Sequence, residues 1–235
     1  MDKKGILYIV STPIGNLDDI TYRAVKILSQ VDVVICEDTR HTLNLLNFLN
    51  IKGKRLICCN AINEKESSDG IIKLLSTGLD MAYCSDAGTP SVSDPGSFLV
   101  NKVRECDFKI VPVPGPSAVS TIISVSGIHG KTFLFEGFFS IKEGKRKKRL
   151  TELIERKEPF VFYESPYRII KVLTELKEIS SNLRVVVGRE MTKIHEEFIV
   201  GTVDEVVDKL KIVKGEFAVC VLPNMCDFKL EKPED

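Results

Sequence analysis

Short apolar runs alternate with helical stretches through the first half of the 235-residue chain. The apolar runs predict five strands, at Ile6–Val10, Val31–Cys36, Arg55–Cys59, Met81–Cys84 and Lys109–Val113. Apolar residues at helical spacing predict the helices between them, at Tyr22–Leu28, Thr39–Leu49, Ile71–Leu75 and Phe98–Arg104. Strands that are apolar throughout are buried on both faces, so this pattern predicts a parallel sheet with helices on each side.

A proline-rich segment, 111–116, interrupts this pattern near the middle of the chain. Its three prolines and one glycine predict a domain boundary at about residue 114. Beyond it, strands are predicted at Thr132–Phe135, Phe160–Tyr163, Leu183–Val187, Glu196–Gly201 and Glu216–Leu222. One helix is expected to begin at Ser117. Three more are expected at about 146–156, Tyr167–Leu176 and Val203–Leu210. The sequence therefore predicts an α/β protein with two α/β domains, 1–114 and 115–235.

Charge and cysteine content exclude several classes of protein. The chain has 33 Lys and Arg against 33 Asp and Glu, which excludes an overall basic nucleic-acid coat but not a local basic patch. Seven Cys without a C-x-x-C motif and only three His predict reduced thiols and no metal site. No apolar run approaches the roughly 20 residues of a membrane span. The first apolar run is predicted to be a strand and not a signal peptide, so we expect a cytoplasmic protein.

Glycine and proline are concentrated in loops that follow the predicted strands of the first half. These loops are Ser11–Asn16, Glu37–Arg40, Ser85–Gly96 and Pro114–Ser117. The first has one glycine, which excludes a dinucleotide-binding fingerprint, and the absence of G-K-[ST] excludes a P-loop. In parallel sheets such loops meet outside the carboxyl ends of the strands. Each loop alone could be a turn with a helix cap, but together they indicate a site for a small polar, zwitterionic ligand.

These loops carry motifs that resemble a known family. The motifs are Tyr8–Thr21, Glu37–Arg40, Ser85–Pro90, Ser93–Gly96, Val113–Ala118, Phe135–Phe138, Phe162–Arg168 and Gly188–Lys193 with Glu196 and Glu197. The set resembles the tetrapyrrole methylase superfamily and, more closely, its branch of 16S ribosomal RNA cytidine 2′-O-methyltransferases. The resemblance covers about residues 5–222. It implies two α/β domains of the tetrapyrrole methylase type with a cofactor cleft between them.

The resemblance implies S-adenosylmethionine as the cofactor. The residues expected to bind it in the first half and at the domain junction are Pro13, Gly88, Pro90, Val92, Ser93, Ser117 and Ala118. Strand ends of the second half are expected to enclose the adenine with Phe162, Tyr163, Phe217 and Ala218. The alternative for these last four residues is a role in the core.

Methyl transfer to a ribose hydroxyl needs alignment and an acceptor for the hydroxyl proton, but no metal. Glu37, Asp38 and Asp86 follow predicted strands and are the candidate catalytic bases. Alternatively, Glu37 or Asp38 only pairs with Arg40 or caps the following helix. Arg40 is a candidate for binding an RNA phosphate, and His41 is a weaker candidate for the base.

A basic run, 142–149, has six Lys or Arg among eight residues. Lys145, Lys148 and Arg149 are expected opposite the apolar face of the helix that follows. Cations in the first turn oppose the helix dipole, so local stability does not explain them and an RNA partner does. The alternative is an ordinary solvated run of charges. Arg168 is a further candidate RNA-binding residue.

Three functions remain open at this point. The first is methylation of 16S rRNA, free or within the assembled small ribosomal subunit, by a protein that the resemblance implies is a homodimer. The second is methylation of a small tetrapyrrole-like acceptor. The third is a non-catalytic RNA-binding factor in ribosome assembly that keeps the cleft as a relic.

Overall fold

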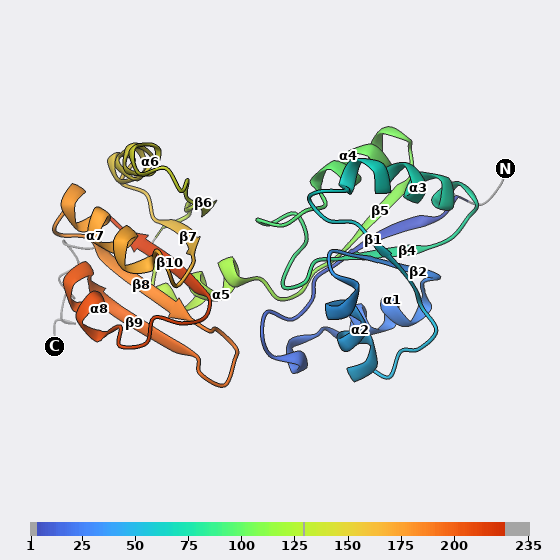
Figure 1. Ribbon diagram of the computed structural model, residues 1–235, viewed down its shortest axis with the longest axis horizontal. Helices are drawn as coiled ribbons and strands as arrows, with labels where there is room; N and C mark the ends of the chain where they lie inside the picture. Colours follow the sequence, from blue (N-terminus) through green and yellow to red (C-terminus); the bar gives the residue numbers. More distant parts are fainter. Residues whose placement is uncertain (1–3, 129, 224–235) are drawn as a thin grey trace, which may run out of the picture. The chain divides into compact units, whose positions relative to one another are not determined.

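The computed structural model describes residues 4–128 and 130–223. The chain divides into two compact units, Met1–Ser117 and Ala118–Asp235, each with its own sheet (Figure 1). The division falls just after the proline-rich segment 111–116. The predicted α/β class with two sheets is confirmed.

The sheet of the first unit is entirely parallel, in the order β3-β2-β4-β1-β5. Its strands are β1 (Ile6–Val10), β2 (Val33–Cys36), β3 (Arg55–Cys58), β4 (Met81–Cys84) and β5 (Lys109–Val113). The last residues of neighbouring strands are register partners: Val10 with Cys84 and with Val113, and Cys36 with Cys84 and with Cys58. The loops that follow the strands therefore start level with one another at one edge of the sheet.

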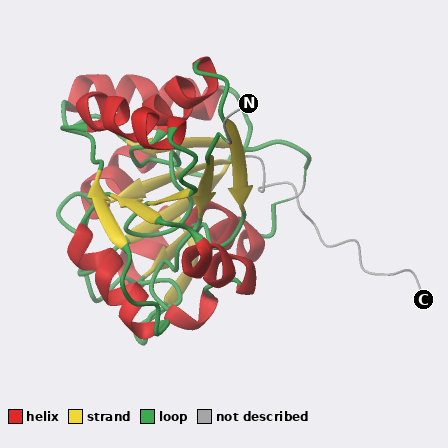
Figure 2. Cartoon of the chain, turned by 90° about the vertical axis from the view of Figure 1, so that its right-hand side faces the viewer, coloured by secondary structure: helices red, strands yellow, loops and turns green. Residues whose placement is uncertain are grey.

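Helices cover both faces of this sheet. They are α1 (Tyr22–Gln30), α2 (Thr39–Phe48), α3 (Glu64–Ser76) and α4 (Ser97–Glu105), with a short 3-10 turn at Leu17–Asp19. One core contains Leu28 of α1 and Leu46 of α2, and the other contains Leu75 of α3 and Leu99 of α4. Figure 2 shows the strands of this unit between the helices. Each fully buried Leu side chain stabilises the fold by about 1.5–3 kcal/mol relative to its exposed state.

The second unit has a mixed sheet in the order β6-β7-β10-β8-β9. The strands are β6 (Leu134–Phe138), β7 (Phe160–Glu164), β8 (Arg184–Arg189), β9 (Glu197–Thr202) and β10 (Phe217–Leu222). Only β6 and β7 pair in parallel, and the other neighbours are antiparallel. A bulge between Phe135 and Gly137 shifts β6 later than its predicted range, and Gly137 supplies the positive φ of +71° there.

The helices of the second unit divide between the two faces of its sheet. They are α5 (Ala118–Ser126), α6 (Glu143–Glu155), α7 (Ile169–Ile179) and α8 (Val203–Lys209). Residues of α6, α7 and α8 share one core with the strands, whereas α5 contacts β8 and β10 (Figure 1). In the described ranges, no helix is long and apolar enough to cross a membrane.

Candidate functional site

The loops after β1 and β4 are joined by a backbone bridge at the carboxyl edge of the first sheet. The N–H of Thr12 donates to the carbonyl of Gly88 at 2.9 Å, and the N–H of Gly88 donates to the carbonyl of Thr12 at 3.0 Å. The hydroxyl of Thr12 also donates to the carbonyl of Ser85 at 3.1 Å. Two loops separated by more than 70 residues in sequence are therefore held in one fixed arrangement.

A chain of hydroxyl groups extends this arrangement to the loop after β5. The Thr89 hydroxyl donates to the Pro116 carbonyl at 3.1 Å. Its oxygen lies 2.9 Å from the Ser11 hydroxyl, which must therefore be the donor of that hydrogen bond. The loops after β1, β4 and β5 thus form one hydrogen-bonded assembly.

The loop after β4 has unusual backbone geometry. Gly88 has a φ of +79°, and a Cβ there would lie 3.3 Å from Cγ2 of Ile14. Ser91 and Ser93 have φ values of +68° and +64°, which are costly for residues other than glycine. Gly88, Pro90, Val92 and Ser93, four of the predicted cofactor residues, lie in this segment, which the surrounding contacts hold in a strained shape.

Asp38 caps α2 and binds Arg40. Its Oδ1 accepts from the Arg40 backbone N–H at 2.8 Å, and its Oδ2 lies 2.6 Å from Nη2 of Arg40. These contacts with Arg40 hold the pKa of Asp38 well below its ordinary value. The structure thus gives Asp38 the capping and pairing role that the sequence analysis weighed against catalysis, and so weak a base is poorly suited to accept a hydroxyl proton.

Glu37 lies among other carboxylates. Burial is the main cause that raises its pKa, and the negative charges of Asp86 and Asp94 raise it further. The backbone N–H of Asp86 donates to the Glu37 carboxylate and partly offsets these effects. Asp86 Oδ1 in turn accepts from the Asp38 backbone N–H at 3.0 Å, so the structure brings the three predicted base candidates together.

Asp94 is a carboxylate that the sequence analysis did not select as a site residue. Burial raises its pKa to about 6, the charge of Asp86 adds to the increase, and a hydrogen bond from the Ser85 side chain opposes it. The sequence offered no signal that Asp94 would be buried beside Asp86. In the described part of the chain, neither Glu37 nor Asp94 has an ion-pair partner.

A pocket of about 200 Å³ opens beside these carboxylates, within the first unit. Its apolar wall consists of Pro13, Leu17 and Leu45. Its polar lining consists of Thr12, His41, Thr42, Asn44, Ser85 and Asp86. The pocket therefore joins the loop after β1, the first two turns of α2 and the start of the loop after β4. Pro13 and His41 were singled out in the sequence, whereas Asn44 and Leu17 were not.

The adenine assignment in the second unit is corrected for two side chains. Phe162 and Phe217 are buried in the core shared with α6, α7 and α8, so their rings are not available to a ligand. Strand alternation directs Tyr163 and Ala218 to the opposite face. Tyr163 is half-buried and its ring lies 5.1 Å from that of Phe135. Tyr163 and Ala218 stay predictions, as do Ser117 and Ala118 at the junction of the units.

The basic run forms the N-terminal half of α6, and part of it is structural. The Arg146 side chain is 2% exposed and binds Glu175 through two hydrogen bonds of 2.7 Å. Arg149 binds Glu136 in the same two-pronged manner, at 2.8 and 2.9 Å. Lys147 pairs with glutamates on α6 and α7. The expectation that stability does not explain these cations is therefore wrong for Arg146 and Arg149, whereas the exposed ion pairs of Lys147 contribute little.

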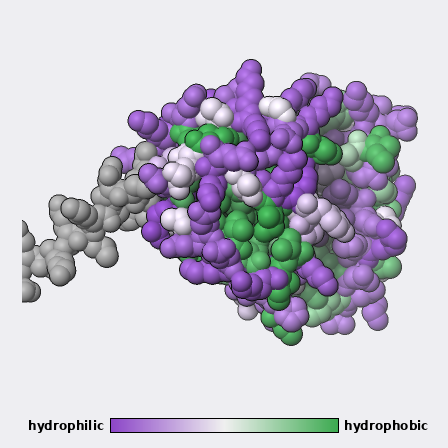
Figure 3. All heavy atoms as spheres, turned by 60° about the vertical axis from the view of Figure 1, so that its left-hand side comes forward, coloured by the Kyte–Doolittle hydropathy of each residue, from purple (hydrophilic) through white to green (hydrophobic). Residues whose placement is uncertain are grey.

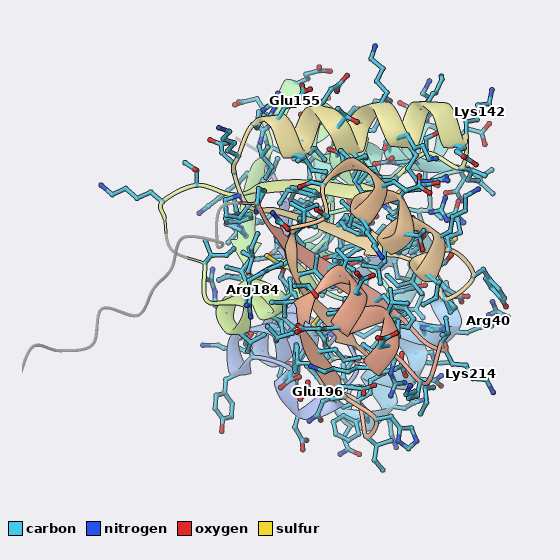
Figure 4. All side chains as sticks on the ribbon, turned by 90° about the vertical axis from the view of Figure 1, so that its left-hand side faces the viewer. Arg40, Lys142, Glu155, Arg184, Glu196 and Lys214 are labelled. Atoms are coloured by element: carbon cyan, nitrogen blue, oxygen red, sulfur yellow. The ribbon has the colours of Figure 1, made fainter. Side chains whose placement is uncertain are left out.

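Lys145 and Lys148 differ from these neighbours because both are exposed. Within residues 130–223, neither has a carboxylate at ion-pair distance. Figure 4 shows α6 between Lys142 and Glu155 with side chains projecting from it, and hydrophilic side chains predominate at the top of the face in Figure 3, where α6 lies. Together with Lys142, which is also exposed at the start of the run, these two lysines are free to contact a polyanion.

The other predicted RNA-binding arginines differ in exposure. Arg168 is 23% exposed and binds the buried carboxylate of Glu164 at 2.7 Å. Arg40 is 86% exposed in its side chain, although it is paired with Asp38. Only Arg40 of these two presents most of its guanidinium surface to solvent.

Comparisons with known proteins agree over nearly the whole chain. A family model described as Tetrapyrrole (Corrin/Porphyrin) Methylases matches residues 6–207. A protein of Borrelia garinii named ribosomal RNA small subunit methyltransferase I is 44% identical over 220 residues, which cover 92% of this chain and 98% of that protein. A Thermotoga maritima protein of the same name is 43% identical and is covered to 97%.

Solved structures show the same fold at low sequence identity. The native form of uroporphyrin III C-methyl transferase from Thermus thermophilus superposes with a TM-score of 0.66 at 15% identity, covering 92% of this chain and 97% of that one. A second structure of that Thermus enzyme gives the same TM-score at 16% identity.

Proposed function

Because the chain belongs to the tetrapyrrole methylase family, within its group of ribosomal RNA small subunit methyltransferases I, we propose that it methylates the 2′-hydroxyl of a cytidine in 16S ribosomal RNA. The methyl donor is S-adenosylmethionine. The observation that carries this proposal is the identity of 40–45% to proteins named for ribosomal RNA of the small subunit. The acceptor nucleotide and the ribose oxygen come from the sequence resemblance.

The loops at the carboxyl edge of the first sheet suit the cofactor. Gly88 adopts a backbone conformation that a side chain would strain and leaves room for Ile14, and Pro90 limits the freedom of the chain beside it. The bridge to Thr12 fixes this backbone before any ligand binds, so little ordering of the loop would oppose binding. The residues proposed to bind the cofactor here are Pro13, Gly88, Pro90, Val92 and Ser93, with Ser117, Ala118, Tyr163 and Ala218 as further predicted contacts.

Glu37 is the best-suited base among the three predicted candidates. S-adenosylmethionine supplies a methyl group activated by a positively charged sulfur. Glu37 would accept the proton of the ribose hydroxyl while that oxygen bonds to the methyl carbon and the sulfur keeps the electron pair of the broken bond. The raised pKa of Glu37 makes it a stronger proton acceptor than an ordinary carboxylate. Asp86 donates its backbone N–H to Glu37 and thereby orients it, which assigns Asp86 a positioning role.

Exposed cations are proposed to hold the RNA. Lys145 and Lys148 are exposed and unpaired, and Arg40 is exposed although it is paired with Asp38, so these three can contact phosphates. Arg149 and Arg168 are less exposed and must first give up carboxylate partners. The protein is proposed to act in the cytoplasm, as a homodimer, on free 16S rRNA or on the small subunit.

The proposal is tested by incubating the purified protein with methyl-labelled S-adenosylmethionine and either 16S rRNA or 30S particles from a strain that lacks the enzyme. We expect label at the ribose of one cytidine, located by nuclease digestion and mass spectrometry. Label in a tetrapyrrole and none in RNA would support the macrocycle alternative. RNA binding without transfer in any condition would support the assembly factor and refute the proposed activity.

A further inference from the structure

The pocket beside Asp86 differs from the loop assigned to the cofactor. Its volume of about 200 Å³ is below the roughly 300 Å³ at which sites for drug-sized ligands begin. A space of this size suits a single planar ring. The pocket and the cofactor loop are adjacent: the Thr12 bridge to Gly88 joins them, and Pro13 is assigned to both.

Most polar groups in the wall of the pocket already have partners. The Thr12 hydroxyl donates to Ser85, and one oxygen of Asp86 accepts from the Asp38 backbone. The Thr42 side chain is hydrogen-bonded to Cys36. These contacts fix the shape of the wall before a ligand enters.

Two side chains of α2 are different. The amide of Asn44 and the imidazole of His41 are exposed, line the pocket, and have no side-chain hydrogen-bond partner among the described residues. An amide offers one acceptor and two donors, and an imidazole ring offers a face on which a base can stack. Leu45 and Pro13 supply the apolar surface for the rest of a ring.

We propose that this pocket binds the nucleobase of the acceptor nucleotide, with Asn44 on its hydrogen-bonding edge and His41 against its face. The inference builds on the proposed function and specifies how that substrate is recognised. Cytosine has an amino donor next to a ring-nitrogen acceptor, and this pair matches the amide of Asn44. The Asp86 carboxylate can also accept a hydrogen bond from the amino group of cytosine. It disfavours uracil, which has a carbonyl oxygen at that position. The base held here places its own ribose near Glu37, which is joined to Asp86.

Binding is tested directly with nucleotides. Cytidine 5′-monophosphate and uridine 5′-monophosphate are titrated into the full-length protein while NMR follows the ring protons of His41 and the methyl groups of Leu45. We expect both sets of signals to shift with the cytidine nucleotide, and the uridine nucleotide to bind about tenfold to a hundredfold more weakly. Equal affinities, or shifts that avoid both residues, would overturn the proposal.

Asn44 has a matched control in the same helix. Asn47 is also an exposed asparagine of α2 and does not line the pocket. We expect Asn44→Ala to lower kcat/KM on 16S rRNA about tenfold or more. Asn47→Ala should stay within about twofold of the wild type, and both variants should bind S-adenosylmethionine normally.

The outcomes separate this inference from the proposed function. Equal activity of Asn44→Ala and Asn47→Ala on 16S rRNA would refute the pocket assignment and leave RNA methylation intact. A wild-type protein that never methylates RNA, yet shows the His41 and Leu45 shifts with the cytidine nucleotide, would refute the proposed function and retain the pocket.

Discussion

The two sheets place their loops in different ways. All five strands of the first sheet run parallel, so every loop that follows a strand starts at the same edge. In the second sheet β7, β10, β8 and β9 alternate in direction, so the loops after them fall at opposite edges. A parallel sheet collects the ends of distant segments into one site, which a mostly antiparallel sheet of similar size does not do.

The two units also use charged residues differently. Glu37 and Asp94 of the first unit are partly buried without a cation, and the pKa of each is raised. In the second unit the most buried charges are paired, as Arg146 with Glu175 and Arg168 with Glu164. Unpaired carboxylates at one edge are available for proton transfer, whereas the paired charges stabilise a fold.

The strongest test of this contrast is the substitution Glu37→Gln. An amide cannot accept the hydroxyl proton, so we expect kcat on 16S rRNA to fall about 10²- to 10⁴-fold with little change in RNA or cofactor affinity. The wild-type rate should increase with pH through the raised pKa of Glu37, because only the ionised carboxylate accepts a proton, and the variant should lose this limb. A normal rate in single-turnover assays would eliminate Glu37 as the base.

The buried pair of the second unit gives the next largest effect. Arg146→Met leaves the buried Glu175 carboxylate without its partner, which should lower the free energy of unfolding by about 3–5 kcal/mol. Urea denaturation followed by circular dichroism measures this change. Lys147→Ala is the control, since its ion pairs are exposed and should contribute less than about 1 kcal/mol. Similar losses in the two variants would contradict the structural role assigned to Arg146.

The loop after β4 is tested with Gly88→Val. A β-branched side chain at a φ of +79° is strained by about 1–2 kcal/mol or more, and its Cβ would press on Ile14. We expect affinity for S-adenosylmethionine, measured by calorimetry, to fall at least about tenfold. Gly53→Val has a similar positive φ with nothing within 4 Å of the new Cβ, so it controls for backbone strain alone. Unchanged affinity in Gly88→Val would refute the loop assignment.

The free cations of α6 should have a smaller effect. We expect Lys145→Glu with Lys148→Glu to weaken RNA binding several-fold and to reduce the slope of log affinity against log salt by about 1.4, for two lost contacts with single-stranded RNA. Cofactor affinity should not change. Filter binding at several salt concentrations measures the slope, and an unaltered slope would place the RNA elsewhere.

The smallest expected effect is at Asp94. Its pKa of about 6 in the folded protein is higher than in an unfolded chain, so the folded state binds more protons and stability falls as pH rises from about 4 through 6. Asp94→Asn should therefore stabilise the protein by about 1 kcal/mol at pH 7.5, after allowance for partial exposure, and by almost nothing below pH 4. Thermal melts across this pH range measure the difference in stability between Asp94→Asn and the wild type. A difference that does not change with pH would contradict the prediction.

Strand positions in the first unit could be predicted closely from sequence. β1, β4 and β5 have the predicted bounds because each is a short apolar run flanked by polar or helix-breaking residues. Helix α3 was recognised only from its apolar end, because its first turns, from Glu64, are polar and exposed on one side. Local sequence pattern therefore predicts the bounds of buried strands better than it predicts the solvated ends of helices.

Pairings across long sequence distances could not be predicted. Nothing near Arg146 in sequence indicates that Glu175 neutralises it, and nothing near Phe162 indicates which face of the sheet is covered by helices. The meeting of Glu37, Asp86 and Asp94 depends on the strand order, in which β2 and β4 are neighbours although β3 lies between them in sequence. Residue types at the site were thus accessible from sequence, and their electrostatic environment was not.

The bridge between Thr12 and Gly88 joins the wall of the pocket to the loop after β4, so that the two move together. Displacement of one residue is passed to the other through two backbone hydrogen bonds, with no side chain required. Substitutions in the two loops should consequently show thermodynamic coupling, so that combined changes depart from the sum of their separate effects. A substitution that alters acceptor choice through the loop after β1 should therefore also alter cofactor affinity.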